Sequence, residues 1–216
     1  SGDLRQKKDF LWNGLCGIED PLRADAGEAI RKALESGIKI KIVTGDYQKT
    51  AEEIAKQLGI EVTASNSING SELEKMSDRD LREKVEEIVI FSRITPEQKL
   101  RIVKALQENG EIVAMTGDGV NDAPALKKAD IGVVMGSGTE VAKEAADLIL
   151  LDGNFKTIVS AVEEGRRIFS NLKKVVSYIL SNSFVEIFLI LGATILRIPA
   201  PLTIVQILWV HLICDG

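Results

Sequence analysis

The amino-acid sequence predicts an α/β domain with a doubly wound, mostly parallel sheet, followed by a long helix and a transmembrane helical hairpin. Two observations support this prediction. Up to about residue 174, short β-branched segments alternate with segments of helical spacing, a pattern typical of a parallel sheet covered by helices. Beyond residue 174 the chain becomes almost wholly apolar.

The predicted strands are short, β-branched segments of the kind found in buried parallel sheets. They are IKIKIVTG (38–45), EEIVIFS (86–92), EIVAMTG (111–117), ADIGVVMG (129–136) and DLILLD (147–152).

The predicted helices lie between these strands, and several end on glycine, the usual residue after a helix C-terminus. They are DAGEAIRKALESG (25–37), YQKTAEEIAKQLG (47–59), TPEQKLRIVKALQENG (95–110) and GTEVAKEAA (138–146). The polar residues 65–86 are predicted to form a surface excursion, a loop followed by a short helix.

The apolar end of the chain has the length of a membrane span. Residues 175–196 contain one charged side chain, Glu186, and a transmembrane helix needs about 20 apolar residues. After RIPAP a second apolar stretch begins at residue 202. Residues 175–216 are therefore predicted to form one span and the start of another, with a pair of buried core helices as the alternative. Basic residues precede the first span and place its N-terminal side in the cytoplasm. They are Arg166, Arg167, Lys173 and Lys174.

Charge and cysteine content exclude some classes of function. The formal net charge is −5, which gives no electrostatic footprint for nucleic acid. Cys16 and Cys214 lie far apart in unlike contexts, so neither a disulfide framework nor a zinc site is indicated.

Two predicted strands end in the same motif. Residues 44–46 and residues 116–118 both read Thr-Gly-Asp, and Asn121 and Asp122 follow the second. In a doubly wound sheet ligands bind beyond the carboxyl ends of the strands. Glycines there let the backbone approach a phosphate, and a carboxylate suits Mg²⁺. The alternative is a pair of tight turns in which each aspartate caps the next helix.

Lys99 adds a cation to this set. A phosphoryl-transfer site needs positive charge on the transferring group, and lysine supplies it as a point charge. The alternative, a solvated lysine on a helix surface, becomes less attractive when two Thr-Gly-Asp motifs accompany it.

The segment MTGDGVNDAPALKKADIGVVMGSGTEVAKEAADLILLDGNF, residues 115–155, closely resembles the hinge region of P-type cation-transporting ATPases, members of the haloacid-dehalogenase-like superfamily. The resemblance extends over nearly the whole chain in the family's order, and the calcium-pump branch is the most similar. The further matching motifs are DPLR (20–23), TGDYQKTAEEIA (44–55), FSRITPEQK (91–99), SNSFVEIF (181–188) and LWVHLICDG (208–216).

The resemblance implies roles for the polar residues at the strand ends. Asp118 would be a ligand of the catalytic Mg²⁺, and Asp122 would hold the loop and act as a second acidic ligand. Asn121 would contact the phosphoryl group, and Lys99 would neutralise its charge.

Other roles implied by the resemblance concern the nucleotide. Thr44 and Gly45 would bind phosphoryl oxygens, with Asp46 near the nucleotide phosphates. Arg93 would reach the nucleotide in the closed state. Asp20 and Arg23 would brace that closure, and Leu22 between them departs from the second proline that the family usually has.

The Asp-Lys-Thr-Gly-Thr motif that carries the family's nucleophile does not occur in this sequence. The resemblance therefore implies a partial phosphorylation domain over residues 1–153, a stalk helix over 154–174, and membrane helices five and the start of six over 175–216. The central strand of the sheet would be missing between the strands that lead to Thr44 and Thr116. Either those strands close up or another chain fills the gap. Alone, the chain is expected to be inactive.

A cation site is predicted within the membrane, where an ionisable group is costly and by default functional. Asn182, Ser183 and Glu186 share a helical face by their spacing, as do His211, Cys214 and Asp215. Glu186 and Asp215 match positions where calcium pumps carry carboxylates, and hard oxygen donors suit Ca²⁺. His211, Cys214 and Ser183 depart from the usual side chains there, which leaves open a softer ion or proton coupling through His211.

The sequence thus predicts a segment of an ATP-driven cation pump that uses Mg²⁺ and ATP and transports Ca²⁺. Its partners would be the lipid bilayer, the transported cation and the remaining nucleotide-binding, actuator and transmembrane segments. It would lie in a membrane as a multi-pass protein with the phosphorylation domain in the cytoplasm. The alternatives are a non-catalytic membrane-anchored regulator with the same fold and a soluble haloacid-dehalogenase-like phosphatase.

Overall fold

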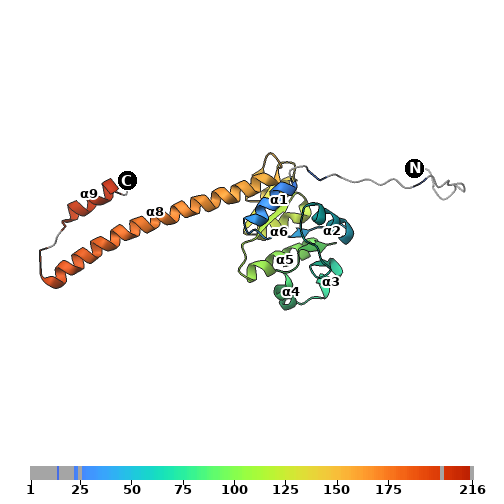
Figure 1. Cartoon of the computed structure of the whole chain (residues 1–216), viewed down its shortest axis with the longest axis horizontal. Helices are drawn as coiled ribbons and strands as arrows, with labels where there is room; N and C mark the ends of the chain where they lie inside the picture. The colour runs from blue at the N-terminus through green and yellow to red at the C-terminus, as the bar shows by residue number, and fades with distance from the viewer. Residues whose placement is uncertain (1–13, 15–21, 24–25, 200–201, 215–216) are drawn as a thin grey trace. The chain divides into compact units, whose positions relative to one another are not determined.

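The computed structural model of the chain describes residue 14 and residues 22–23, 26–199 and 202–214. The chain divides into two compact units, Ser1–Gly153 and Asn154–Gly216. Among the described residues, the first unit contains α1 to α7 and the six strands β1 to β6, and the second contains the helices α8 and α9 (Figure 1).

The strands of the first unit form two separate three-stranded sheets, and every pairing is parallel. The first sheet has the order β1-β3-β2, and the second has the order β4-β5-β6. Their bounds are β1 Ile42–Val43, β2 Ser67–Asn69, β3 Ile90–Ser92, β4 Ala114–Gly117, β5 Ile131–Met135 and β6 Leu148–Leu150. The predicted parallel α/β architecture is confirmed.

Helices connect the parallel strands, as parallel pairing requires. They are α1 (Ala26–Glu35), α2 (Gln48–Gln57), α3 (Gly70–Lys75), α4 (Asp78–Lys84), α5 (Pro96–Glu108), α6 (Ala123–Lys128) and α7 (Glu140–Ala145), with a 3-10 turn, η2, at Val120–Asp122. The sequence of α5 shows how locally these starts are encoded. Thr95 and Gln98 form a capping box, and Pro96 occupies the first turn, where its missing N–H has no helical partner to lose.

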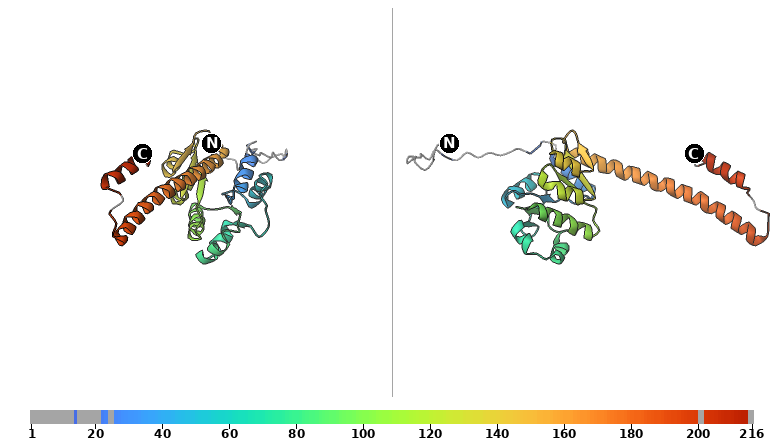
Figure 2. Two further views of the ribbon diagram at one scale, coloured as in Figure 1. Left: turned by 60° about the vertical axis from the view of Figure 1, so that its left-hand side comes forward. Right: turned by 180° about the vertical axis from the view of Figure 1, so that it is seen from behind.

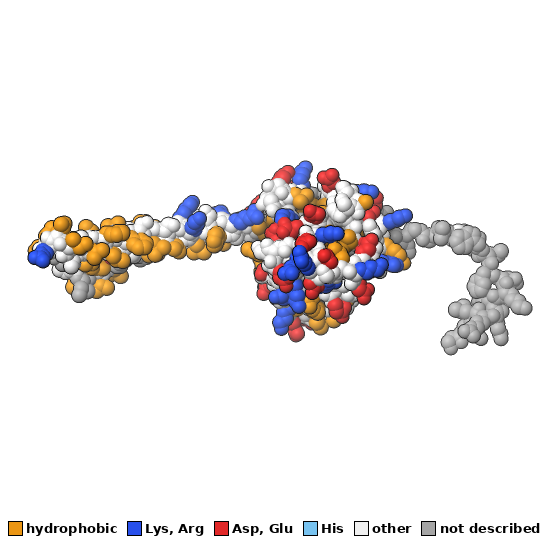
Figure 3. Space-filling model, turned by 90° about the horizontal axis from the view of Figure 1, so that it is seen from below, with side chains coloured by type: hydrophobic (Ala, Val, Ile, Leu, Met, Phe, Trp, Pro, Cys, Tyr) orange, Lys and Arg blue, Asp and Glu red, His pale blue; other side chains and the backbone are white. Residues whose placement is uncertain are grey.

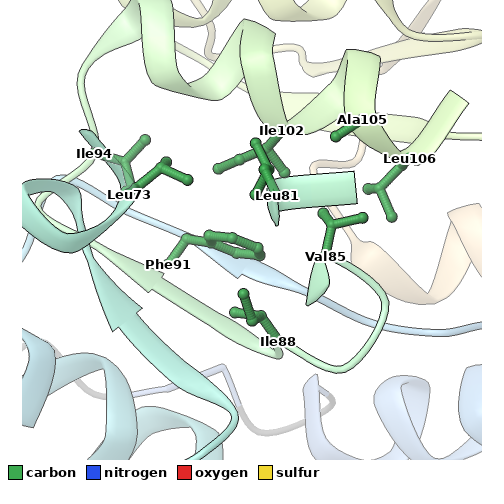
Figure 4. Packing of buried hydrophobic residues seen from close by; sticks show 9 residues of the cluster. All are labelled: Leu73, Leu81, Val85, Ile88, Phe91, Ile94, Ile102, Ala105 and Leu106. Carbon is green, nitrogen blue, oxygen red and sulfur yellow. The ribbon is translucent and has the colours of Figure 1, made fainter. Parts of the chain in front are cut away.

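The main hydrophobic core surrounds Phe91 of β3, whose side chain is fully buried (Figure 4). Helix α5 contributes Ile102, Ala105 and Leu106 to this cluster. A smaller cluster, made of Leu126, Val134 and Ala142, lies under the second sheet. Because α5 packs against the first core and also contacts α6, it connects the two sheets.

Residues 65–86 are a correction to the sequence prediction of a surface excursion. They contain the strand β2, which pairs with β3, and the helices α3 and α4. Leu73, Leu81 and Val85 from this segment are fully buried in the Phe91 core. These apolar residues are too widely spaced among charged ones to give a periodic signal, so the pattern resembled a loop.

The edges of β1 and β4 do not pair with each other. Of the two outcomes expected for a missing central strand, closure of the sheet is therefore not observed. Alternate residues of β4, Ala114 and Thr116, remain exposed.

The second unit begins with α8, Phe155–Leu196, a helix of 42 residues that runs uninterrupted through the predicted stalk and first span (Figures 1 and 2). It ends at Arg197, which adopts a left-handed conformation. Its most apolar window has a mean hydropathy of 2.0 and is unburied, which disfavours a core helix. Figure 3 shows hydrophobic side chains along much of its surface.

The predicted second apolar stretch forms α9, Ile204–Cys214. With 11 residues it is shorter than a membrane span. Within the described ranges, α8 is the one helix long and apolar enough to cross a membrane.

Candidate functional site

The first Thr-Gly-Asp motif forms a closed turn at the end of β1. Thr44 continues the strand, since its N–H donates to the Phe91 carbonyl at 2.9 Å. Its Oγ1 then donates to Oδ2 of Asp46 at 3.1 Å and accepts from the Asp46 N–H at 3.1 Å. Gly45 and Asp46 are exposed. The motif therefore presents its backbone at the carboxyl edge of the sheet.

The second Thr-Gly-Asp motif leads from β4 into η2, and Asp122 organises this loop. The Asp122 N–H donates to the Gly119 carbonyl at 3.1 Å, and its Oδ2 accepts from the Gly119 N–H at 3.4 Å. A Cβ at Gly117 would lie 2.5 Å from the Cβ of Asp122, a separation that real side chains do not adopt. The loop therefore requires glycine at position 117.

Lys99 reaches from α5 into this loop. Its Nζ donates to Oδ1 of Asp122 at 2.5 Å, and the two side chains are only 14% and 12% exposed. Such a charge-assisted contact, shielded from water, is stronger than a surface ion pair. Spatial proximity in the fold thus joins Lys99 to Asp122 across 23 positions of sequence.

Asp118 occupies a different environment from Asp122. Its backbone carbonyl accepts from the Thr139 N–H at 2.9 Å, which fixes the loop against the start of α7. Its carboxylate is exposed and makes no hydrogen bond or ion pair within the described part of the chain. Asn121 is likewise exposed beside it. The loop thus offers one free carboxylate, that of Asp118.

The oxygen donors of this loop fit Mg²⁺ with Asp118 as the protein ligand. Mg²⁺ takes one or two carboxylates and completes its shell with phosphate and water. Both oxygens of Asp122 already accept hydrogen bonds, so a second ligand role would require Asp122 to share an oxygen with Lys99 or Gly119. Across residues 26–199 and 202–214, no three His, Cys, Asp or Glu side chains gather as a closed metal site.

Arg93 lies beside the first motif and next to Tyr47, a residue that was not predicted from the sequence. The Arg93 N–H donates to the Asp46 carbonyl at 3.0 Å. Its guanidinium carbon lies 4.2 Å from the ring centroid of Tyr47. An aromatic residue directly after the Thr-Gly-Asp motif was the only sequence signal for this contact. The structure therefore groups Arg93 with residues 44–47 and groups Lys99 with Asp122.

The braces expected around nucleotide closure are described only in part. Arg23 donates a hydrogen bond to the carbonyl of Gly153, the last residue of the first unit. Asp20 lies outside the described residues.

Those predicted ion-binding residues of the membrane segment that the structure describes lie on α8 and α9. Asn182, Ser183 and Glu186 are half-buried on α8, whereas the residues between them are exposed. Ser183 Oγ donates to the Ile179 carbonyl at 3.1 Å. His211 lies on α9, with its side chain outside what the structure describes, and Asp215 is not among the described residues.

Comparison with known families and proteins gives a consistent result. Residues 6–130 match the haloacid dehalogenase-like hydrolase family, and residues 99–162 match a second family of the same description. A calcium-transporting ATPase of Bacillus subtilis is 50% identical over 97% of this chain, which covers 24% of that protein. Human calcium-transporting ATPase type 2C member 1 is 50% identical over 94% of the chain, which covers 22% of it. The chain thus spans about a quarter of the length of these relatives.

Solved structures show the same relationship. A zinc-transporting PIB-type ATPase in the E2.Pi state aligns with a TM-score of 0.63 and 32% identity, over 84% of this chain and 25% of that one. The catalytic domain of a CPx-ATPase aligns with a TM-score of 0.50 and 31% identity, over 65% of this chain and 45% of that domain. The chain therefore belongs to the haloacid dehalogenase-like hydrolase family, and its relatives within it are calcium-transporting P-type ATPases.

Proposed function

We propose that the chain is the part of an ATP-driven P-type cation pump that holds Mg²⁺ and the phosphoryl group and contributes to the path of the ion. The observation that supports this most strongly is the shielded Lys99–Asp122 pair beside the free carboxylate of Asp118. In this arrangement a fixed positive charge and a hard oxygen donor lie at the carboxyl end of a parallel strand, where α/β folds bind ligands.

The residues of the loop have different roles at the phosphoryl group. Lys99 places its charge on the transferring group, while Asp122 fixes the ammonium and the loop. Asp118 holds Mg²⁺, which when bound neutralises charge on the phosphoryl oxygens. Thr44 and Gly45 approach those oxygens from the other motif, with Asp46 towards the nucleotide phosphates, and Asn121 contacts the phosphoryl group.

The nucleophile enters on a strand from another segment of the pump. β1 and β4 are each an edge strand of their sheet, and their unpaired edges leave backbone donors and acceptors for a further strand. A carboxylate at the end of such a strand would stand between Thr44 and Asp118, at the edge where both motifs end. The remaining nucleotide-binding, actuator and transmembrane segments are therefore the chain's obligate partners.

The second unit places the ion path in a bilayer. Helix α8 crosses the membrane, and its basic residues before position 175 keep the first unit in the cytoplasm. Glu186 lies within the apolar part of α8 and forms the centre of the cation site with Asp215. Asn182, Ser183 and His211 complete the set. The transported ion is Ca²⁺, as the names of the relatives suggest.

Two alternatives are less well supported. A soluble phosphatase has no use for the unburied apolar surface of α8. A membrane-anchored regulator would keep the fold without turnover, and every curated relative named above is instead a transporting ATPase. A measurement of ATP hydrolysis distinguishes the regulator hypothesis from the pump hypothesis.

The proposal is tested by placing this chain in a relative. In a chimera, it replaces the matching 24% of the Bacillus subtilis calcium-transporting ATPase. We expect Ca²⁺-dependent, Mg²⁺-requiring ATP hydrolysis, and we expect Asp118→Asn to abolish it. Glu144→Gln, which removes an exposed carboxylate from α7, is the matched control and should retain activity. A well-folded chimera without Ca²⁺-dependent hydrolysis, beside an active parent, would refute the proposal.

A further inference from the structure

Arg93 has an unusual backbone that the surrounding chain enforces. Its φ is +52°, in the left-handed region that residues other than glycine seldom occupy. The Arg93 N–H donates to Asp46, and the next N–H, that of Ile94, donates to Thr44, each at 3.0 Å. The carbonyl oxygen of Arg93 lies so close to Gly70 that any Cβ there would collide with it. Strain of this kind persists where neighbouring contacts over-determine it, and such places are often ligand sites.

The side chain of Arg93 is stacked on Tyr47 rather than paired with an acid. The guanidinium carbon lies 4.2 Å above the ring centroid, which is within the range of a cation–π contact. Arg93 is exposed and forms no ion pair with any described residue. Stacking occupies the face of the guanidinium and leaves its N–H donors at the edge free to bind an anion.

No other interaction among the described residues explains the ring of Tyr47. It is the N-cap residue of α2, but its side chain makes no capping hydrogen bond. The residue is 67% exposed, so it does not stabilise a core. The contact with Arg93 is therefore the interaction that distinguishes this side chain.

The pair lies at a cavity of about 780 Å³ beside the carboxyl ends of β1, β2 and β3. The cavity is lined by Tyr47, Gln48, Lys49, Asn69, Ser71 and Arg93, together with Glu52. Glu52 is engaged by Gln48, whose Nε2 donates to it at 2.9 Å. Two cations thus face the cavity against one engaged acid, which favours an anionic ligand.

We infer that Tyr47 is a positioning residue, which holds the Arg93 guanidinium at this cavity for the phosphate chain of the nucleotide. This inference rests on the proposed function. A free arginine side chain loses rotamer entropy when it binds a ligand, and stacking on Tyr47 removes part of that loss in advance.

The inference is tested with two readouts, the first on the full chain in detergent and the second on the Bacillus subtilis chimera, in which the remaining segments of the pump are present. The first is the Nε–Hε resonance of Arg93 by NMR, identified by its disappearance in Arg93→Ala. We expect Tyr47→Leu to remove the ring-current shift of this resonance and Tyr47→Phe to retain it. The second readout is the affinity for a non-hydrolysable ATP analogue with Mg²⁺, measured by calorimetry. We expect Tyr47→Leu to weaken binding about two- to fivefold and Tyr47→Phe to restore it.

A double-mutant cycle separates positioning from other effects. If Tyr47 acts through Arg93, Tyr47→Leu has no further effect on affinity in the Arg93→Ala background. An unchanged Arg93 resonance in Tyr47→Leu, or an equal loss of affinity in both backgrounds, would overturn the inference. Absence of analogue binding in every variant, with the Arg93 resonance still dependent on Tyr47, would instead overturn the nucleotide role of the proposed function and of this pair with it.

Discussion

The ammonium Nζ of Lys99 lies 2.5 Å from Oδ1 of Asp122, and the two side chains are 14% and 12% exposed. This contact joins α5, which packs on the first sheet, to the loop that follows strand β4 of the second sheet. The charge that would act on a phosphoryl group is thus also a structural link between two sheets that share no strand pairing.

The variant Lys99→Met should destabilise the first unit by about 3 kcal/mol, because Asp122 would remain buried without its cation. Asp122→Asn in the same chain should recover part of this loss, since it removes the unpaired charge. The free energy of unfolding can be measured by urea titration in detergent with proteolysis of the unfolded fraction. Additive losses in the double variant would show that the two residues are not coupled.

Gly117→Ala should displace Asp122, because the new Cβ would lie 2.5 Å from the Asp122 Cβ. We expect a loss of about 1–3 kcal/mol in stability and faster hydrogen exchange in η2 and α6. Gly119→Ala is the matched control, since its Cβ would meet its nearest atom, Oδ2 of Asp122, at an ordinary 3.6 Å. Equal hydrogen exchange in the two variants would contradict the explanation that Gly117 is required because a Cβ there would collide with Asp122.

Phe91→Ala should cost about 3–5 kcal/mol and unfold much of the first unit, because its side chain is the largest among the fully buried ones and lies within the main core. Leu151→Ala, at a site that is 91% exposed, should change stability by less than about 0.5 kcal/mol. The same urea titration measures both. A Phe91→Ala chain as stable as Leu151→Ala would show that the core lies elsewhere.

Lys41 should make stability depend on pH in the alkaline range. Its Nζ donates to the carbonyls of Val85, Glu86 and Ile88 at 2.7, 3.0 and 2.6 Å. Burial, followed by the charge of Lys39, lowers the Lys41 pKa from 10.5 to about 8. Between these two values the unfolded chain binds this proton more tightly than the folded chain. The Lys41 contribution to stability therefore rises with pH across that window.

Comparing the wild type with Lys41→Met measures the contribution of Lys41 to the pH dependence of stability. Between pH 8 and pH 10.5 the free energy of unfolding of the wild type should rise relative to that of Lys41→Met. Hydrogen bonds to Glu111 and Glu86 raise the Lys39 pKa above 10.5, so the contribution of Lys39 itself is lost only above this window. Because the Lys39 charge helps to lower the Lys41 pKa, Lys39→Met should reduce the slope within the window without abolishing it. Parallel curves for wild type and Lys41→Met would contradict the prediction.

Local sequence signals were sufficient for much of the first unit. The β-branched segment around Val133 and the Thr95–Gln98 capping box each encode their element within a few residues. Local sequence signals were not sufficient for residues 65–86. Their buried residues, such as Leu81, are separated by charged side chains, and their strand β2 is defined by pairing with β3. Pairing of this kind is a tertiary effect that a window of sequence does not contain.

The candidate site was predictable in its residue types but not in its contacts. Two Thr-Gly-Asp motifs and Lys99 indicated phosphate and Mg²⁺ chemistry. Lys99 pairs with Asp122 and leaves Asp118 free because of the way α5 packs. The motifs alone do not determine this packing. The role of Tyr47 was missed for the same reason, because its ring acquires a function only when the strained backbone of Arg93 turns towards it.

The measurement that tests the central claim most directly is ATP-driven uptake of radioactive calcium by vesicles that contain the Bacillus subtilis chimera. The claim is that this chain links a Mg²⁺–phosphate site at Asp118 to a cation site at Glu186. We predict Mg²⁺- and ATP-dependent uptake with the unaltered chain, no uptake with Asp118→Asn, and a reduced apparent Ca²⁺ affinity with Glu186→Gln. Uptake that persists in Asp118→Asn, or a Ca²⁺ affinity that Glu186→Gln leaves unchanged, would contradict the account.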